Sequence, residues 1–286
     1  KEQYKYLYFI KYLEKVLSKI NSLILIKKKR NILLEGRLKK TIKFLETLLV
    51  KKKVGPSKYY VINQNINLVK NINKFLLNEK NFVLSALNLA LLGSFFSGRV
   101  RLFNNMYFWP DGYLPLLITE KYKNIKKLAG RNMLRKLRLP SIMKKIHVCG
   151  NLTRSQKKYL SNRFKIKVLF TKIPYGTTYK LVKYFPKFKR NVLYIFTLPT
   201  PKQEELAEII STKNKNYKII LIGGALNILT GLEKEVPRKF EYIESIWRLR
   251  FDTYHRLSRF IITGTQFIIN YLTKDKQNYI FQIKYK

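Results

Sequence analysis

The sequence predicts an α/β protein whose body is a parallel, Rossmann-like sheet flanked by helices. Two short runs of β-branched and aromatic residues, Val192–Phe196 and Ile219–Ile222, each pass directly into a turn and a helical pattern. Such a strand-then-helix unit, written twice in succession, is typical of parallel sheets. Anions bind these folds in the loops after the strands, where free backbone N–H groups and helix dipoles converge.

A basic region, residues 1–57, precedes the body. It contains sixteen Lys or Arg and only four Glu, and apolar residues recur at helical spacing in both halves, so we predict a helical hairpin. Two runs of like charges lie side by side without acids: Lys27, Lys28, Lys29 and Arg30, then Lys51, Lys52 and Lys53. These runs favour a binding arm over a merely solvated helical pair.

Gly55-Pro56-Ser57 marks a boundary, after which we expect the body over residues 58–232. The longest apolar run, Phe82–Phe96, is too short to span a bilayer with ease. We therefore predict no transmembrane segment, and we expect this run to be a buried or extended helix or an interfacial contact.

The remaining chain, residues 233–286, is expected to form a C-terminal helical appendage and a tail. Within it, the apolar stretch Phe267–Leu272 and the strand-like Tyr279–Lys286 have no assigned role.

Net charge is the dominant feature of the composition. The chain has 59 Lys and Arg against 16 Asp and Glu, a formal charge of +43. A solvated surface is the ordinary explanation, but an excess this large indicates a partner that supplies negative charge, and nucleic acid supplies it most densely. Because 46% of the residues are hydrophobic, a disordered basic tail is excluded.

Cysteine and histidine are scarce. Cys149 is the only cysteine, so an intrachain disulfide is impossible. His147 and His255 are the only histidines, and we expect no metal site and no cofactor. His147 is expected to be a satisfied histidine at a strand end. The N-terminus lacks a clean apolar core, so no signal peptide is predicted.

Residue usage predicts a gene in an AT-rich organelle. Alanine is scarce, whereas Lys, Asn, Ile, Tyr and Phe abound, and their codons consist mainly of A and T. The mitochondrion is the expected location.

A basic segment, Lys172–Lys189, is loop-like, with aromatic residues interleaved among lysines: Tyr175, Tyr179, Tyr184, Phe185 and Phe188. Two interpretations stay open. Aromatic rings beside cations are typical of nucleic-acid binding, and loose aromatic residues in a loop are also typical of local packing.

Several motifs occur in order towards the end of the chain. They are Pro201-Lys202-Gln203-Glu204, Gly223-Gly224-Ala225 with Gly231 and Pro237, and then Glu244, Arg248-Leu249, Arg256 and Arg259. In order and spacing they resemble the C-terminal half of the WecB/TagA/CpsF glycosyltransferase family. Members of that family transfer an N-acetylmannosamine-type sugar from a UDP donor to a lipid-linked acceptor.

The resemblance implies both elements and site residues. It places a strand and helix at Tyr59–Lys70, a strand and glycine turn at Ile146–Gly150, and a helix at Gln156–Phe164. Phe108-Trp109-Pro110-Asp111-Gly112 resembles the element whose aspartate is the family's proposed general base, although Asp111 also suits an ordinary turn. The residues implied at the donor are Asn65, Gln203, Gly223, Gly224 and Asn227. Those implied at phosphate, or at an RNA backbone, are Arg248, Arg256 and Arg259.

Other positions depart from the family pattern. Thr197–Thr200 stands where the family has glycines that let the backbone approach the nucleotide. Asn227 replaces an aspartate, and Glu235 replaces an arginine. Further departures are Asn63, Asn132 and Ser245. Because basic positions are kept while acidic and glycine positions are lost, we expect a degenerate member that has lost catalysis and gained polyanion binding.

We therefore expect a structural RNA-binding component of an organellar, mitochondrial ribosome, built on a glycosyltransferase-like fold without catalytic residues. Its partners would be rRNA and neighbouring ribosomal proteins, with no small-molecule substrate. Two alternatives stay open. One is an active inverting glycosyltransferase with Asp111 as general base, and the other is an accessory subunit of a mitochondrial membrane complex that contacts anionic lipid.

Overall fold

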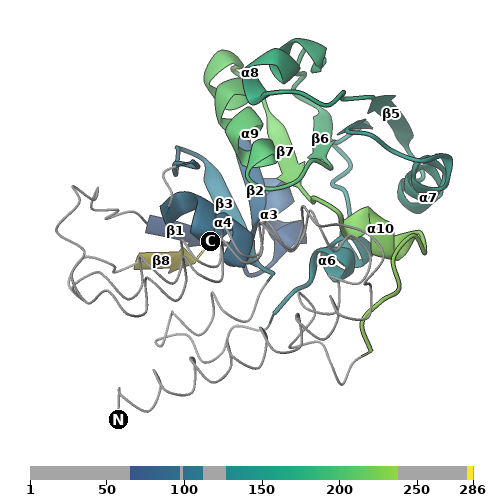
Figure 1. Ribbon diagram of the computed structural model, residues 1–286, viewed down its shortest axis with the longest axis horizontal. Coiled ribbons are helices and arrows are strands. Elements are labelled where there is room, and N and C mark those ends of the chain that lie inside the picture. The colour runs from purple at the N-terminus through teal and green to yellow at the C-terminus, as the bar shows by residue number, and fades with distance from the viewer. Residues whose placement is uncertain (1–64, 97–98, 112–126, 238–281, 286) are drawn as a thin grey trace, which may run out of the picture. The chain divides into compact units, whose positions relative to one another are not determined.

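The computed structural model describes residues 65–96, 99–111, 127–237 and 282–285 (Figure 1). The chain divides after Ser57 into two units, and every described residue belongs to the second. The predicted hairpin of residues 1–57, the apolar stretch Phe267–Leu272 and most of the predicted C-terminal appendage therefore lie outside the described residues.

One sheet organises the described residues, with strand order β5-β4-β6-β7-β2-β3-β1-β8. Every pair of neighbouring strands runs parallel. The strands are β1 (Asn65–Leu68), β2 (Phe82–Leu87), β3 (Met106–Pro110), β4 (Lys145–Cys149), β5 (Lys167–Thr171), β6 (Val192–Phe196), β7 (Lys218–Leu221) and β8 (Gln282–Tyr285). The predicted α/β class with a Rossmann-like parallel sheet is confirmed.

Helices cover both faces of this sheet (Figure 1). One face packs against α3 (Ile72–Asn78), α6 (Gly130–Lys136), α7 (Arg154–Phe164) and α10 (Ala225–Leu229). The other packs against α4 (Leu89–Phe96), α8 (Thr178–Leu181), the 3-10 turn η1 (Val182–Tyr184) and α9 (Lys202–Lys213). Successive strand residues alternate between the two cores, as the side-chain period of a strand requires: Leu193 and Ile195 face the first, Tyr194 and Phe196 the second.

The run Phe82–Phe96 is a strand followed by a helix, so the predicted continuous helix is wrong. Its first part is β2, which lies between β7 and β3 and is buried along its whole length. A strand covered on both faces carries no polar alternation, so its apolar run cannot be told from a helix by period alone. The helix α4 begins after Asn88, whose Oδ1 accepts from the backbone N–H of Leu91 at 3.0 Å.

The observed bounds of α7 lie close to the helix that the resemblance implied at Gln156–Phe164. Thr153 and Gln156 form a capping box, each side chain accepting from the other's backbone N–H. The helix therefore begins two residues before the expected Gln156. It ends at Phe164, as expected, and its C-cap residue Lys165 adopts a left-handed conformation. The strand predicted at Val192–Phe196 is observed with those bounds as β6.

The sheet extends beyond the expected body of residues 58–232. The final strand β8 comes from the tail and pairs in parallel with β1, with Ile66 opposite Ile283. A strand-like tail segment without an assigned role therefore supplies an edge strand. No helix within the described ranges is long and apolar enough to cross a bilayer.

Candidate functional site

The parallel sheet brings most of the predicted donor residues to one edge. Asp111 follows β3, Gln203 begins α9 after β6, and Gly223 and Gly224 follow β7. Asn65 is different, because it is the first residue of β1 and so lies at the opposite, amino edge. The structure does not unite Asn65 with the other residues that the resemblance implied.

Asp111 has a structural role at this edge. Its Oδ1 accepts from the backbone N–H of Gly130 at 2.8 Å, at the first residue of α6. The Nδ2 of Asn88 lies 3.5 Å from Oδ2. A carboxylate in this place accepts from a free N–H at the start of the helix and is attracted to the positive end of the helix dipole. These two interactions explain the aspartate without a catalytic role.

The sheet changes its winding direction between β4 and β6, because β4 connects outward to β5 and β6 connects the other way to β7. Ligands of open α/β sheets bind at such a switch point. Here Gly150 follows β4 and Thr197 follows β6. A Cβ on Gly150 would overlap Thr197 Oγ1 and lie 3.2 Å from Thr197 Cβ. The Thr197 side chain therefore fills the space beside Gly150.

Gln203 points its amide into the protein. The side chain is almost fully buried, with Oε1 accepting from the backbone N–H of Gly223 at 3.2 Å. Its Nε2 donates to Glu204 Oε1 at 2.9 Å and to Thr200 Oγ1 at 3.3 Å. These contacts link the β6 and β7 loops that were expected to hold a nucleotide.

Glu204 is buried at the heart of that network, with 1% of its surface exposed. Its Oε1 accepts from Ser85 Oγ at 3.0 Å and from Thr200 Oγ1 at 3.1 Å. Its Oε2 is also buried and has no hydrogen-bond partner in the described part of the chain. Burial raises the pKa of the Glu204 carboxyl, although hydrogen bonds from Gln203, Ser85 and Thr200 oppose the shift. The burial of this acid depends on tertiary packing and is not visible in the residue pattern.

Asn227 and Glu235, two departures from the family pattern, also make internal contacts. Asn227 Oδ1 accepts from Gln156 Nε2 at 2.9 Å, and its Nδ2 donates to Glu233 Oε1 at 2.7 Å. Glu235 pairs with the buried Arg131 at 2.6 Å and with Arg135 at 3.1 Å. Hydrogen bonds from Arg135 and then Arg131 lower the pKa of Glu235. An arginine at this position would instead repel two neighbouring guanidinium groups.

A second feature is a stretch without acids. Residues 127–203 contain twenty Lys or Arg and no Asp or Glu. This acid-free stretch forms α6, β4, α7, β5, α8, η1 and β6, and so builds the β5 end of the sheet. The absence of acids over these residues is visible in the sequence itself. Neither the total charge nor the short runs of lysine reveal it.

The structure divides the aromatic residues of Lys172–Lys189 between the two open interpretations. The Phe185 ring lies 4.7 Å from Phe196 and the Phe188 ring lies 4.0 Å from Tyr194, centroid to centroid, so both pack locally. Tyr175, Tyr179 and Tyr184 are instead 95%, 84% and 43% exposed. The composition could not separate these sets, because the distinction depends on which rings face β6.

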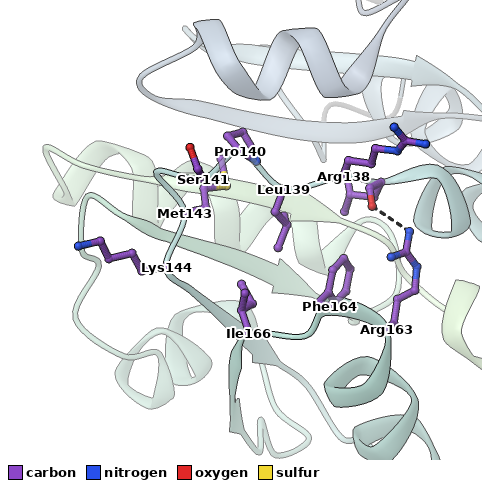
Figure 2. Close-up of a pocket in the computed structure, with 10 residues that line it drawn as sticks. Arg138, Leu139, Pro140, Ser141, Met143, Lys144, Arg163, Phe164 and Ile166 are labelled. Atoms are coloured by element: carbon purple, nitrogen blue, oxygen red, sulfur yellow. Dashed lines mark hydrogen bonds between the residues drawn. The ribbon is translucent and has the colours of Figure 1, made fainter.

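A cavity of about 420 Å³ lies near the amino ends of β4 and β5 (Figure 2). Its apolar wall includes Met143 and Phe164, and Arg138 and Lys144 also line it. The guanidinium of Arg163 donates to the carbonyl oxygens of Arg135 and Leu137 at 2.7 and 2.9 Å, which fixes one wall. The cavity contains none of the predicted donor residues, so it is separate from the carboxyl edge.

The predicted histidine and cysteine residues of β4 have structural roles. Nε2 of His147 lies 2.7 Å from Thr171 Oγ1, a satisfied histidine on a strand. Cys149 is buried, and burial raises the pKa of its thiol far above the ordinary range. No cluster of three His, Cys, Asp or Glu that could hold a metal occurs in the described ranges. The predicted phosphate-binding residues lie outside those ranges: Lys27, Lys28, Lys29, Arg30, Lys51, Lys52, Lys53, Arg248, Arg256 and Arg259.

No protein-family model matches the chain, and no curated protein matches it either. The fold and the contacts define an α/β protein with a filled carboxyl edge and a basic end.

The buried acid Glu204 should make stability depend on pH. Its folded-state pKa is raised above the ordinary value of 4.5, so its contribution to stability is complete below that pH and is lost as pH rises through the folded pKa. Glu204→Gln imitates the protonated acid. We expect the variant to lose less stability than the wild type between about pH 5 and pH 8.

Urea midpoints at the two pH values measure this difference. Parallel profiles for wild type and Glu204→Gln would contradict the assignment.

Gly150→Ala should destabilise the fold by about 1–3 kcal/mol, because its methyl group would crowd the Thr197 hydroxyl. Adding Thr197→Ala removes that oxygen, although the two Cβ atoms would still lie 3.2 Å apart. We therefore expect the double variant to be more stable than the sum of the single variants predicts. Additive losses of unfolding free energy in urea would show that the two residues do not crowd each other.

Proposed function

We propose that this protein is a structural RNA-binding component of a mitochondrial ribosome, in which a glycosyltransferase-like fold has become a support for a basic surface. The observation that carries the proposal is the acid-free stretch of residues 127–203 at the β5 end of the sheet. Cations without neighbouring acids attract a phosphate backbone and release its counterions on binding. The partners would be rRNA and neighbouring ribosomal proteins.

Exposure of the cations supports this proposal. Solvent-exposed Lys and Arg occur along α7, β5 and the segment that follows: Arg154, Lys157, Lys158, Lys165, Lys167, Lys172, Lys180, Lys183, Lys187, Lys189 and Arg190. Within the described ranges, ion pairs join Arg99 to Glu205 and Arg131 and Arg135 to Glu235, and none involves these cations. Their charge is therefore left for a partner.

The carboxyl edge supports the loss of sugar transfer. Gln203 and Asn227 hydrogen-bond to protein groups, and the Thr197 side chain occupies the switch point. A nucleotide there would have to displace these contacts. The mitochondrial assignment rests on residue usage, since the abundant residues have AT-rich codons.

Salt-dependent binding to RNA tests the proposal. The full-length protein should bind a labelled rRNA fragment, and log K should fall linearly with log salt concentration. Replacing Lys158, Lys165 and Lys167 by Gln should weaken binding and reduce the slope by about 2–3, the amount expected for three lost phosphate contacts. The matched control, with the same change in charge, replaces Lys74, Lys80 and Lys213, which are exposed elsewhere.

Four results would overturn the proposal. Equal weakening by both triple variants would indicate attraction by net charge alone. Absence of the protein from purified mitochondrial ribosomes, or its retention on membranes after nuclease treatment, would favour a lipid-bound role. Release of UDP from UDP-N-acetylmannosamine with a polyprenyl-diphosphate acceptor, abolished by Asp111→Asn, would establish the enzyme instead.

A further inference from the structure

The segment after β5 turns its apolar side chains inward and three tyrosines outward. Ile173 and Leu181 are 3% and 1% exposed and belong to the core beneath α9. Tyr175 and Tyr179 are 95% and 84% exposed, and Tyr184 is 43% exposed. We call these three residues the tyrosine platform. Rings this exposed contribute little to the core, so core packing does not explain them.

Contacts with α9 hold the segment that carries the platform. Lys202 Nζ donates to the carbonyl oxygen of Gly176 at 2.7 Å, next to Tyr175. Thr178 Oγ1 donates to Glu205 Oε2, next to Tyr179. After Tyr184, Phe185 packs on Phe196 of β6. Each tyrosine therefore lies next in sequence to a residue that contacts the sheet or α9, which fixes the local backbone that carries the ring.

Cations alternate with the rings of the platform. Lys172, Lys180, Lys183 and Lys187 are exposed in the same segment, and Lys183 Nζ lies 5.3 Å from the centroid of the Tyr184 ring. The segment belongs to the acid-free stretch, and the acid of α9 that reaches it, Glu205, hydrogen-bonds to Thr178 and pairs with Arg99 rather than with these lysines. Flat apolar rings beside exposed lysines match the two parts of an unpaired nucleotide, its base and its phosphate.

We propose that the tyrosine platform binds unpaired RNA, with Tyr175 and Tyr179 stacking on bases while the neighbouring lysines contact the phosphates. The inference rests on the proposed function, since it names the form of RNA that this part of the basic surface takes. Duplex RNA fits the rings poorly, because its bases are already stacked and paired. The platform therefore selects a loop, a bulge or a single-stranded end, with little preference among bases.

Fluorescence anisotropy of the full-length protein tests the platform. The probes are one labelled RNA strand of about 12 nucleotides, within the range of known stacking sites, and the same strand annealed to its complement. Tyr175→Ala/Tyr179→Ala should weaken single-strand binding by about 10-fold or more and leave duplex binding unchanged. Tyr175→Phe/Tyr179→Phe is the matched control, because it keeps both rings and should bind like the wild type.

The outcomes separate this inference from the function on which it rests. Wild-type protein that binds neither probe overturns both proposals. In two further results the wild type binds both probes, while the alanine pair either has no effect or weakens binding to strand and duplex equally. Either result overturns the platform alone and leaves the proposed basic surface in place. Loss of single-strand binding in the phenylalanine pair also overturns it, because stacking needs only the ring. Equal thermal melting of all variants establishes that they are folded.

Discussion

The arrangement of the molecule depends on the parallel pairing of β6, β7 and β2, which are buried on both faces. Parallel strands all end at the same edge, so this pairing gathers the loops after β3, β6 and β7. In a parallel sheet whose loops carry small residues, the same gathering of loops leaves room for a nucleotide to approach the backbone. Here Thr197 and Gln203 turn their side chains into the protein, and the edge becomes part of the packed interior.

Three acids of the described body make internal contacts that support the fold. Glu204 is buried, Asp111 bonds to the start of α6, and Glu235 pairs with Arg131 and Arg135. None of these carboxylates lies in the acid-free stretch. These acids therefore support the fold, while the exposed lysines and arginines of the acid-free stretch raise the potential at the β5 end of the sheet.

A sequence pattern predicts an element correctly when only one type of secondary structure fits the pattern. It fails when both a strand and a helix fit. Val192–Phe196 was predicted with its observed bounds because an apolar run of strand length is bounded by polar residues and turns. Phe82–Phe96 joins a doubly buried strand to an apolar helix, and no period separates the two. The burial of Glu204 and the exposure of Tyr175 depend on tertiary packing, which side-chain type alone does not encode. The acid-free stretch could have been read directly from the sequence.

The closed carboxyl edge and the basic β5 end are physically separate features. Thr197 and Gln203 close the edge through packing and neutral hydrogen bonds, so closure requires no added lysine. Conversely, a net charge of +43 opposes compaction through self-repulsion. A polyanion that binds only the folded state would offset that repulsion through linkage between binding and folding. The requirements of the fold therefore do not explain the charge.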